Sequence, residues 1–225
     1  MSKAWFVTGT DTEVGKTAIS CALLAAAARE GLRTAAVKPV AAGCDGQGRN
    51  EDALQLMAAM TESMEYQQVN PVALQAAIAP HIAAAREGRH LQASRLAGLC
   101  RGAMLGGAEF VLIEGAGGWR VPINPRETLA DLAVQLRLEV ILVVGMRLGC
   151  INHALLSAEA IRGDGLRLAG WVANQPGQRM SCHEENLDTL CRLLPAPLLG
   201  EVPYLDPFLP EEAADHLSLK ALLGK

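Results

Sequence analysis

The first 17 residues restrict the possible folds more than any other stretch, because they combine an apolar segment, a polar loop and the start of a helix. Residues 4–8 (AWFVT) are mostly apolar, and Gly9 and Gly15 bracket the polar segment 9–17 (GTDTEVGKT), which an alanine- and leucine-rich run follows. In such a unit the backbone N–H groups of the loop and of the helix start converge on phosphate oxygens, and the helix dipole adds positive potential there. The stretch therefore predicts a phosphate-binding loop and a nucleotide ligand.

Two side chains of this loop have predicted roles. Lys16 would reach the β- and γ-phosphates, and Thr17 would offer its hydroxyl to magnesium, which prefers hard oxygen ligands. The motif is a variant, because five residues separate Gly9 and Gly15 where four are usual, and Thr10 stands at the expected glycine position. A strand-to-helix turn that merely contains Gly-Lys-Thr is the alternative, and the flanking strand and helix favour the phosphate loop over it.

Length and composition restrict the domain organisation and the partners. The chain has 225 residues, half of them hydrophobic, so we expect residues 1–225 to form a single domain. The formal charge is −4 and no run of Lys or Arg forms a stripe, so nucleic acid is not an expected partner. No cationic-then-apolar leader precedes the first strand, and no apolar run approaches the roughly 20 residues of a membrane span. We therefore expect a cytoplasmic protein without a membrane partner.

Short apolar runs alternate with helical patterns along the rest of the chain. We expect strands at residues 34–37, 110–113, 140–144, 168–173 and 198–201. We expect helices at residues 16–30, from Asn50 onward, and at 91–105, 128–137, 151–161, 181–194 and 211–223. Residues 41–49 should form a loop, and residues 61–89 should form loops and helical fragments. The alternation predicts an α/β fold with three layers, a parallel β-sheet covered by helices on both faces.

Ligands of such a sheet bind beyond the carboxyl ends of its strands, where Lys38, Glu114 and Asn174 are expected. Glu114 follows a wholly apolar run and could complete a magnesium shell with Thr17, or it could simply face water. Lys38 could shield a sheet edge, or it could place a second cation at the phosphates. Asn174 could cap a turn or bind a nucleobase edge. Guanine is not supported, because Gly177 stands where an aspartate would be needed.

Two further positions are ambiguous from their place in the chain alone. Asp52 would most simply stabilise the start of a helix through the helix dipole. The helix start at residues 149–152 (GCIN) could bind an anion, although every helix has such an end.

Five segments taken together carry a resemblance to a known family: residues 9–17 (GTDTEVGKT), 38–41 (KPVA), 114–118 (EGAGG), 149–154 (GCINHA) and 170–174 (GWVAN). In this order and spacing they resemble dethiobiotin synthetase, of the P-loop NTPase superfamily, over nearly the whole chain. The resemblance implies a homodimer that uses ATP, magnesium and CO2 to close the ureido ring of 7,8-diaminopelargonate. It also implies a carbamate of one substrate amine, a carbamic-phosphoric anhydride, and attack on that anhydride by the second amine.

The resemblance implies the following site residues. Those of the nucleotide site are Thr12, Glu13, Val14, Gly15, Lys16, Thr17, Glu114, Asn174, Val202, Pro203 and Tyr204. Those of the substrate site are Thr12, Lys38, Ala42, Gly117 and, from the partner subunit at the dimer interface, the backbone at Cys150, Ile151 and Asn152. The magnesium ligands are Thr17, Asp52 and Glu114, the catalytic residues are Lys16 and Lys38, and residues 79–81 should lie near the substrate.

The chain departs from the family at Ala42, where a serine is common, so one hydroxyl contact to the substrate or carbamate would be missing. A neutral hydrogen bond contributes about 0.5–1.5 kcal/mol, which affects affinity more than reaction type. Two other functions remain open. A regulatory P-loop ATPase commonly carries a lysine early in the loop, where this chain has Thr10 and Asp11. A related amidoligase that acts on another acid would keep most of these motifs.

Overall fold

Strands and helices alternate along the chain in the computed structural model, which describes residues 3–224. In chain order the elements are β1 (Lys3–Gly9), α1 (Lys16–Arg29), β2 (Thr34–Val37), β3 (Val40–Ala42), α2 (Glu51–Ala59), α3 (Tyr66–Val69), β4 (Val72–Leu74), α4 (Pro80–Arg86), α5 (Ala93–Met104), β5 (Phe110–Gly118), α6 (Leu129–Leu136), β6 (Glu139–Gly145), α7 (Cys150–Gly163), β7 (Leu168–Asn174), α8 (His183–Leu193), β8 (Leu198–Val202), α9 (Pro210–Ala214) and α10 (Lys220–Leu223).

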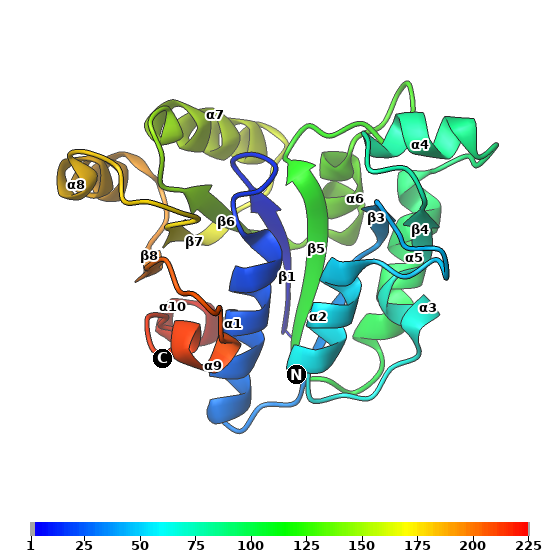
Figure 1. The fold of residues 1–225 in the computed structure, drawn as a ribbon, viewed down its shortest axis with the longest axis horizontal. Coiled ribbons are helices and arrows are strands. Elements are labelled where there is room, and N and C mark those ends of the chain that lie inside the picture. The colour runs from blue at the N-terminus through cyan, green and yellow to red at the C-terminus, as the bar shows by residue number, and fades with distance from the viewer. Residues whose placement is uncertain (1–2, 225) are drawn as a thin grey trace.

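Six of the strands form one parallel sheet in the order β2-β5-β1-β6-β7-β8. β1 lies in the middle, with β5 on one side and β6 on the other (Figure 1). The chain order reverses at this point of the sheet, so the loop that follows Gly9 opens where α/β sheets bind their ligands.

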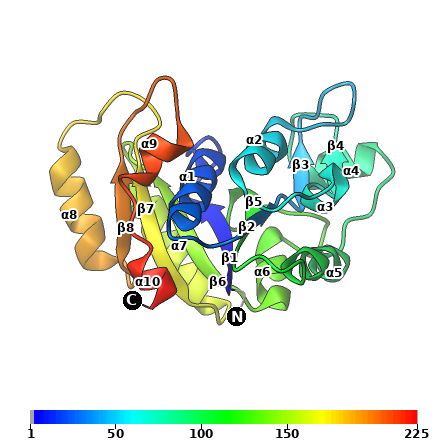
Figure 2. The same ribbon diagram turned by 90° about the horizontal axis from the view of Figure 1, so that it is seen from below.

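Alternate side chains of β1 enter two different hydrophobic layers. Trp5 and Val7 pack with buried residues of α1, α9 and α10, whereas Phe6 packs with those of α5, α6 and α7. Figure 2 shows α1 and α9 on one side of the sheet and α5 and α6 on the other. The predicted three-layer α/β fold is therefore confirmed.

Helix α1 approaches the sheet closely because small side chains face it. Ala22 and Ala27 are fully buried in the layer between this helix and the sheet. The helix ends at Arg29, and Gly31 adopts the left-handed conformation (φ 80°) that is common for a glycine just past a helix end.

Three predictions about secondary structure need correction. Residues 41 and 42, expected at the start of a loop, belong to β3, which pairs in parallel with β4 from the region expected to hold only loops and helical fragments. The strand expected at 110–113 continues to Gly118. The helix expected at 211–223 is two short helices, α9 and α10.

The terminal helix is interrupted because residues 215–219 turn to contact β8. The backbone N–H of Ser218 donates to the carbonyl of Leu199 (2.7 Å), and Leu217 forms a bridge with Gly200. A Cβ on Gly200 would lie 1.9 Å from the carbonyl oxygen of His216, so only glycine permits this approach. Between residues 3 and 224, no helix is both long and apolar enough to cross a bilayer.

Candidate functional site

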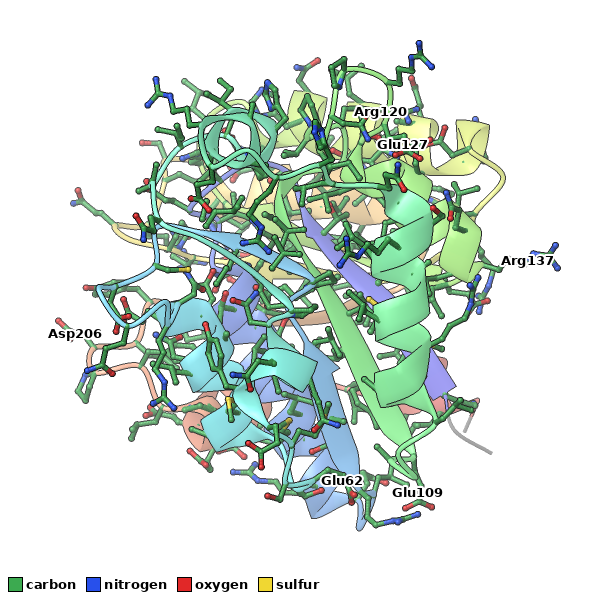
Figure 3. The ribbon with its side chains drawn as sticks, turned by 90° about the vertical axis from the view of Figure 1, so that its right-hand side faces the viewer. Glu62, Glu109, Arg120, Glu127, Arg137 and Asp206 are labelled. Carbon is green, nitrogen blue, oxygen red and sulfur yellow. The ribbon has the colours of Figure 1, made fainter. Side chains whose placement is uncertain are left out.

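A pocket of about 720 Å³ opens at the carboxyl edge of the main sheet. Figure 3 identifies this edge of the sheet by the two ends of β5. Glu109, which precedes the strand, lies at the lower edge of the molecule, and Arg120 and Glu127, which follow its carboxyl end, lie at the upper edge. The residues that line the pocket are Thr12, Glu13, Gly15, Lys16, Thr17, Ala18, Lys38, Ala41, Ala42, Asp52, Ala77, Ile78, Ala79, Pro80, Ala116, Gly117, Val121 and Pro122. The pocket therefore joins the phosphate-loop candidate to the ends of β2, β3 and β5.

The loop between β1 and α1 is held by the ends of two neighbouring strands. The N–H of Thr10 donates to the carbonyl of Val143 on β6 (2.9 Å), and Asn174 Nδ2, at the end of β7, donates to the carbonyl of Val14 (2.8 Å). Gly15 has φ 82°, and a Cβ there would lie 2.2 Å from Asn174 Nδ2. The amide nitrogen of Asn174 thus supports the loop, a contact that the sequence did not predict.

Lys16 extends from the start of α1 into the pocket. Its Nζ donates to the carbonyl of Asp11 (3.0 Å), and the residue is buried. Burial, together with the positive charge of Lys38 nearby, lowers the pKa of Lys16 to about 8. A lysine held in this way gains favourable interactions when an anion enters the pocket, because a negative charge beside it favours its protonated form.

Three residues that line the pocket, Lys38, Asp52 and Thr17, form a cluster with the buried Glu114, which is bonded to Lys38 and Thr17. Lys38 Nζ lies 2.6 Å from Glu114 Oε1 and 2.9 Å from Asp52 Oδ2. The same nitrogen donates to the carbonyl of Gly115 (3.1 Å), and the hydroxyl of Thr17 donates to Glu114 Oε1 (2.7 Å). The side chains of Lys38 and Glu114 are 4% and 0% exposed, so each buried charge requires the other. Lys38 therefore faces the pocket and does not shield a sheet edge.

The surroundings of Lys38 and Asp52 shift the pKa values of these two groups. Burial by itself would lower the pKa of Lys38, but Glu114 and Asp52 together raise that pKa above its ordinary value. Burial would raise the pKa of Asp52, but the ammonium of Lys38, the Thr17 hydroxyl and the charge of Lys16 together lower the pKa of that carboxyl. The cluster therefore favours an ammonium between two carboxylates.

The donor atoms of this cluster fit a hard divalent cation. Glu114 Oε2 is buried and has no hydrogen-bond partner, so one carboxylate oxygen is left for a further ligand. Magnesium is commonly held by one or two carboxylates together with phosphate oxygens and water, and Glu114, Asp52 and the Thr17 hydroxyl are oxygen donors of this kind. No group of three or more His, Cys, Asp or Glu side chains in metal-binding arrangement occurs among residues 3–224.

The remaining predicted residues separate into two groups. Thr12 and Glu13 are exposed at the rim of the pocket, Ala42 and Gly117 line it, and Val14 is buried beneath the loop. Residues 202–204, at and after the end of β8, and residues 150–152, at the start of α7, do not line the pocket as the described residues form it. Asn174 and Val202 are paired across β7 and β8, so these two predicted nucleotide residues lie side by side.

Some residues of the pocket wall were not predicted from the sequence. Ile78, Val121 and Pro122 line it from two loops, although the neighbouring Ala79 and Pro80 were expected near the substrate. Their place in the chain was the available signal, because Val121 and Pro122 come within four residues of Gly118, the glycine-rich end of β5.

Comparison with known proteins gives consistent matches over nearly the whole chain. The model of a family described as an AAA domain matches residues 3–212. ATP-dependent dethiobiotin synthetase BioD of Cellvibrio japonicus is 60% identical, over 98% of this chain and 98% of the relative. The protein of the same name from Pseudomonas aeruginosa is 58% identical, over 97% of each. ATP-dependent dethiobiotin synthetase BioD 1 of Escherichia coli O157:H7 is 52% identical, over 91% of this chain and 92% of the relative.

Solved structures with a similar fold are more distant in sequence. The MinC:MinD cell division protein complex of Aquifex aeolicus contains a chain with a TM-score of 0.60 and 14% identity, covering 100% of this chain and 96% of that one. A ParA family ATPase from Chlorobium tepidum TLS has a TM-score of 0.56 and 12% identity, covering 100% and 94%. At these identities the similarity concerns the fold alone.

Proposed function

Because the chain belongs to the AAA domain family and to the ATP-dependent dethiobiotin synthetases, we propose a role in the reaction for each part of its pocket. The protein is a ligase that closes the ureido ring of dethiobiotin from 7,8-diaminopelargonate, CO2 and ATP, with release of ADP and phosphate. The observation that carries the proposal is that the Gly15–Lys16–Thr17 loop and the buried Lys38 face one pocket. A phosphate and a second negatively charged reactant could therefore be held next to each other.

The loop from Thr12 to Thr17 binds the phosphates of ATP through its backbone N–H groups, and Lys16 contacts the β- and γ-phosphates. Glu13, Val14 and Gly15 shape this loop. Asn174 and residues 202–204 bind the adenine. The pairing of Asn174 with Val202 supports this assignment, because it brings the ends of β7 and β8 together beside the loop.

Magnesium is held by Thr17, Asp52 and Glu114. The unpartnered Glu114 Oε2 and the oxygen donors around it support this assignment. When bound, the ion neutralises charge on the β- and γ-phosphates.

The reaction proceeds through a carbamate that forms when one amine of the substrate adds to CO2 and loses a proton. A carbamate oxygen attacks the γ-phosphorus and ADP leaves, which gives a carbamic-phosphoric anhydride. The second amine then attacks the carbamoyl carbon, loses its proton, and releases phosphate as the ring closes. Lys16 and Lys38 stabilise the negative charge on phosphate and carbamate oxygens throughout, and Thr12, Ala42 and Gly117 bound the substrate.

The enzyme acts as a homodimer, with the backbone N–H groups at Cys150, Ile151 and Asn152 of the partner subunit binding the distant carboxylate of the substrate. Two observations support this arrangement. Helix α7 starts next to the exposed Leu148 (93% exposed), and Leu156 on the same helix is also exposed, so apolar surface is available for a second copy. A carboxylate bound at the start of a helix of 14 residues also benefits from its dipole. We further propose that residues 1–225 form one domain and that the enzyme works in the cytoplasm.

Product formation by the purified protein tests the proposal. ADP release should require diaminopelargonate, bicarbonate and magnesium together, and Lys16→Ala should abolish it. ATP hydrolysis independent of substrate would instead support a regulatory ATPase, and turnover only with an unrelated carboxylic acid would support a different amidoligase. Either result would reject the proposed function.

A further inference from the structure

A series of hydrogen bonds outside the pocket connects the backbone of Lys38 to the helix that carries Asp52. The Tyr66 hydroxyl donates to Asn70 Oδ1 (3.0 Å) and accepts from the backbone N–H of Asn50 (2.8 Å). Asn70 Nδ2 donates to the backbone carbonyl of Lys38 (2.7 Å). Tyr66 and Asn70 are not among the described residues that line the pocket, so their contacts with the site are indirect.

At one end of this series, the backbone of Lys38 is bound on both sides. Strand β2 pairs with β5 only as far as Val37, so Lys38 lies just beyond the sheet ladder. Its N–H donates to the carbonyl of Val69 (2.8 Å), and its carbonyl accepts from Asn70. The short helix α3 and the residue after it therefore hold the backbone from which the Lys38 side chain extends.

At the other end, the series reaches the first turn of α2. Asn50 is the N-cap of this helix, and its Oδ1 accepts from the N–H of Ala53 (3.4 Å). Asp52 lies within the same turn, so the position of the cap also sets the position of the Asp52 carboxylate.

Two sets of contacts bear on the distance between Lys38 and Asp52, whose side chains meet at 2.9 Å. The chain between them runs through β3 and a loop with three glycines (Gly43, Gly46 and Gly48), and Asn50 Nδ2 donates to the carbonyl of Ala42 (3.3 Å) at the end of β3. The hydrogen bonds of Tyr66 and Asn70 join the same two ends from outside that loop. We propose that Tyr66 and Asn70 are positioning residues that hold Lys38 and Asp52 at the separation the reaction needs. That the reaction needs this separation rests on the proposed function. The separation itself can be tested without ligands.

The first test measures the coupling between Lys38 and Asp52 in the absence of metal and nucleotide. Tyr66→Phe removes the hydroxyl and keeps the ring, over which the Arg49 guanidinium lies at 5.5 Å. Thr34→Val is the matched control, because it removes a buried hydroxyl that accepts from the N–H of Thr61 (3.0 Å) at the opposite end of β2. The coupling is obtained from a double-mutant cycle with Lys38→Met and Asp52→Asn, in which the free energy of unfolding is measured with urea in the presence of EDTA. The cycle is repeated in three backgrounds: the unsubstituted chain, Tyr66→Phe and Thr34→Val.

We expect Tyr66→Phe to reduce the Lys38–Asp52 coupling, expressed as a ratio of unfolding constants, at least about threefold. Thr34→Val should lower overall stability and leave the coupling unchanged. Equal coupling on all three backgrounds would overturn the proposal, because the hydrogen bonds would then support the fold without setting the distance between the two charges.

The second test measures the affinity of the ADP-bound protein for Mg²⁺ by titration calorimetry. Tyr66→Phe should weaken it about tenfold, the effect typical of residues that orient metal ligands, and Thr34→Val should leave it within about twofold. An unchanged affinity in Tyr66→Phe would overturn the proposal. If the unsubstituted chain with ADP bound no Mg²⁺ while the first test succeeded, the metal assignment of the proposed function would fail and the positioning of Lys38 and Asp52 would stand.

Discussion

Replacing Lys38 with methionine should destabilise the protein more than replacing either of its carboxylate partners. Lys38 Nζ lies 2.6 Å from Glu114 Oε1, and the side chain of Glu114 is 0% exposed. When the ammonium is removed, the Thr17 hydroxyl is the one side-chain hydrogen-bond donor left to Glu114 among residues 3–224. Removing one partner of a buried ion pair costs about 3–5 kcal/mol. Because Lys16 lies near enough for Glu114 to affect its pKa, it compensates in part, so we expect Lys38→Met to cost about 3 kcal/mol.

The opposite substitutions should cost less, because Lys38 has two carboxylate partners. In Glu114→Gln the ammonium keeps Asp52 at 2.9 Å, so the loss is that of one charge-assisted hydrogen bond, about 1.5–3 kcal/mol. Asp52 is 43% exposed, and Asp52→Asn should cost less than about 1 kcal/mol because water screens the pair. The double variant Lys38→Met/Glu114→Gln should be more stable than Lys38→Met alone, since it no longer buries an unpaired carboxylate.

Urea unfolding at pH 7 without nucleotide or metal, followed by circular dichroism, measures these differences. A loss of about 3 kcal/mol corresponds to roughly a hundredfold increase in the unfolding constant, which is well above the error of the method. The reasoning is refuted if Glu114→Gln is as costly as Lys38→Met, or if the double variant loses the sum of the two single losses.

Three further predictions concern the loop and the substrate wall. Gly15→Ala should lower the free energy of unfolding by about 1–3 kcal/mol and the affinity for ADP at least about tenfold, because a Cβ at φ 82° would lie 2.2 Å from Asn174 Nδ2. The control is Gly31→Ala, which is also at positive φ but has no atom within 4 Å of the added Cβ. It should leave the affinity unchanged when ADP is titrated into both variants. Since the pKa of Lys16 is lowered to about 8, its charge is lost as the pH rises through that value, so ADP affinity should fall above about pH 8, and Lys16→Ala should bind weakly without this inflection. Ala42→Ser should lower the KM for diaminopelargonate about two- to tenfold in steady-state assays, and an unchanged KM would show that position 42 makes no polar contact with the substrate.

The sequence predicted the elements that follow a strong local pattern and missed those that depend on contacts distant in the chain. The apolar runs at 110–113 and 140–144 are unambiguous as buried strands, and their alternation with helical patterns predicted a parallel sheet, although it did not predict the order of the strands. Strand β4 has only three residues and is defined by its pairing with β3, so no periodicity could reveal it. The interruption before α10 depends on Gly200, which lies far from it in the sequence.

The same distinction applies to the candidate site. Lys16 and Glu114 belong to recognisable motifs, and the resemblance to a family added Asp52, whose position alone favoured only stabilisation of a helix start through the helix dipole. From the sequence, Lys38 could either shield a sheet edge or place a cation at the phosphates. In the structure the Lys38 side chain points toward Glu114 and Asp52, and both carboxylates are within hydrogen-bond distance of its Nζ. The support of Lys38 by Asn70 could not be predicted, since it is a hydrogen bond from the Asn70 side chain to the Lys38 backbone carbonyl across 32 positions of the chain.

The contact between Asn174 and the carbonyl of Val14 has a consequence for protein engineering. A library that varies position 174 to alter nucleobase preference also removes a support of the phosphate loop, because the same amide nitrogen holds Val14 and lies over Gly15. Variants selected there for a new base would lose turnover for a reason unrelated to base recognition. Redesign of the nucleotide preference should therefore begin at residues 203 and 204, the other positions that we propose at the adenine, because they are exposed.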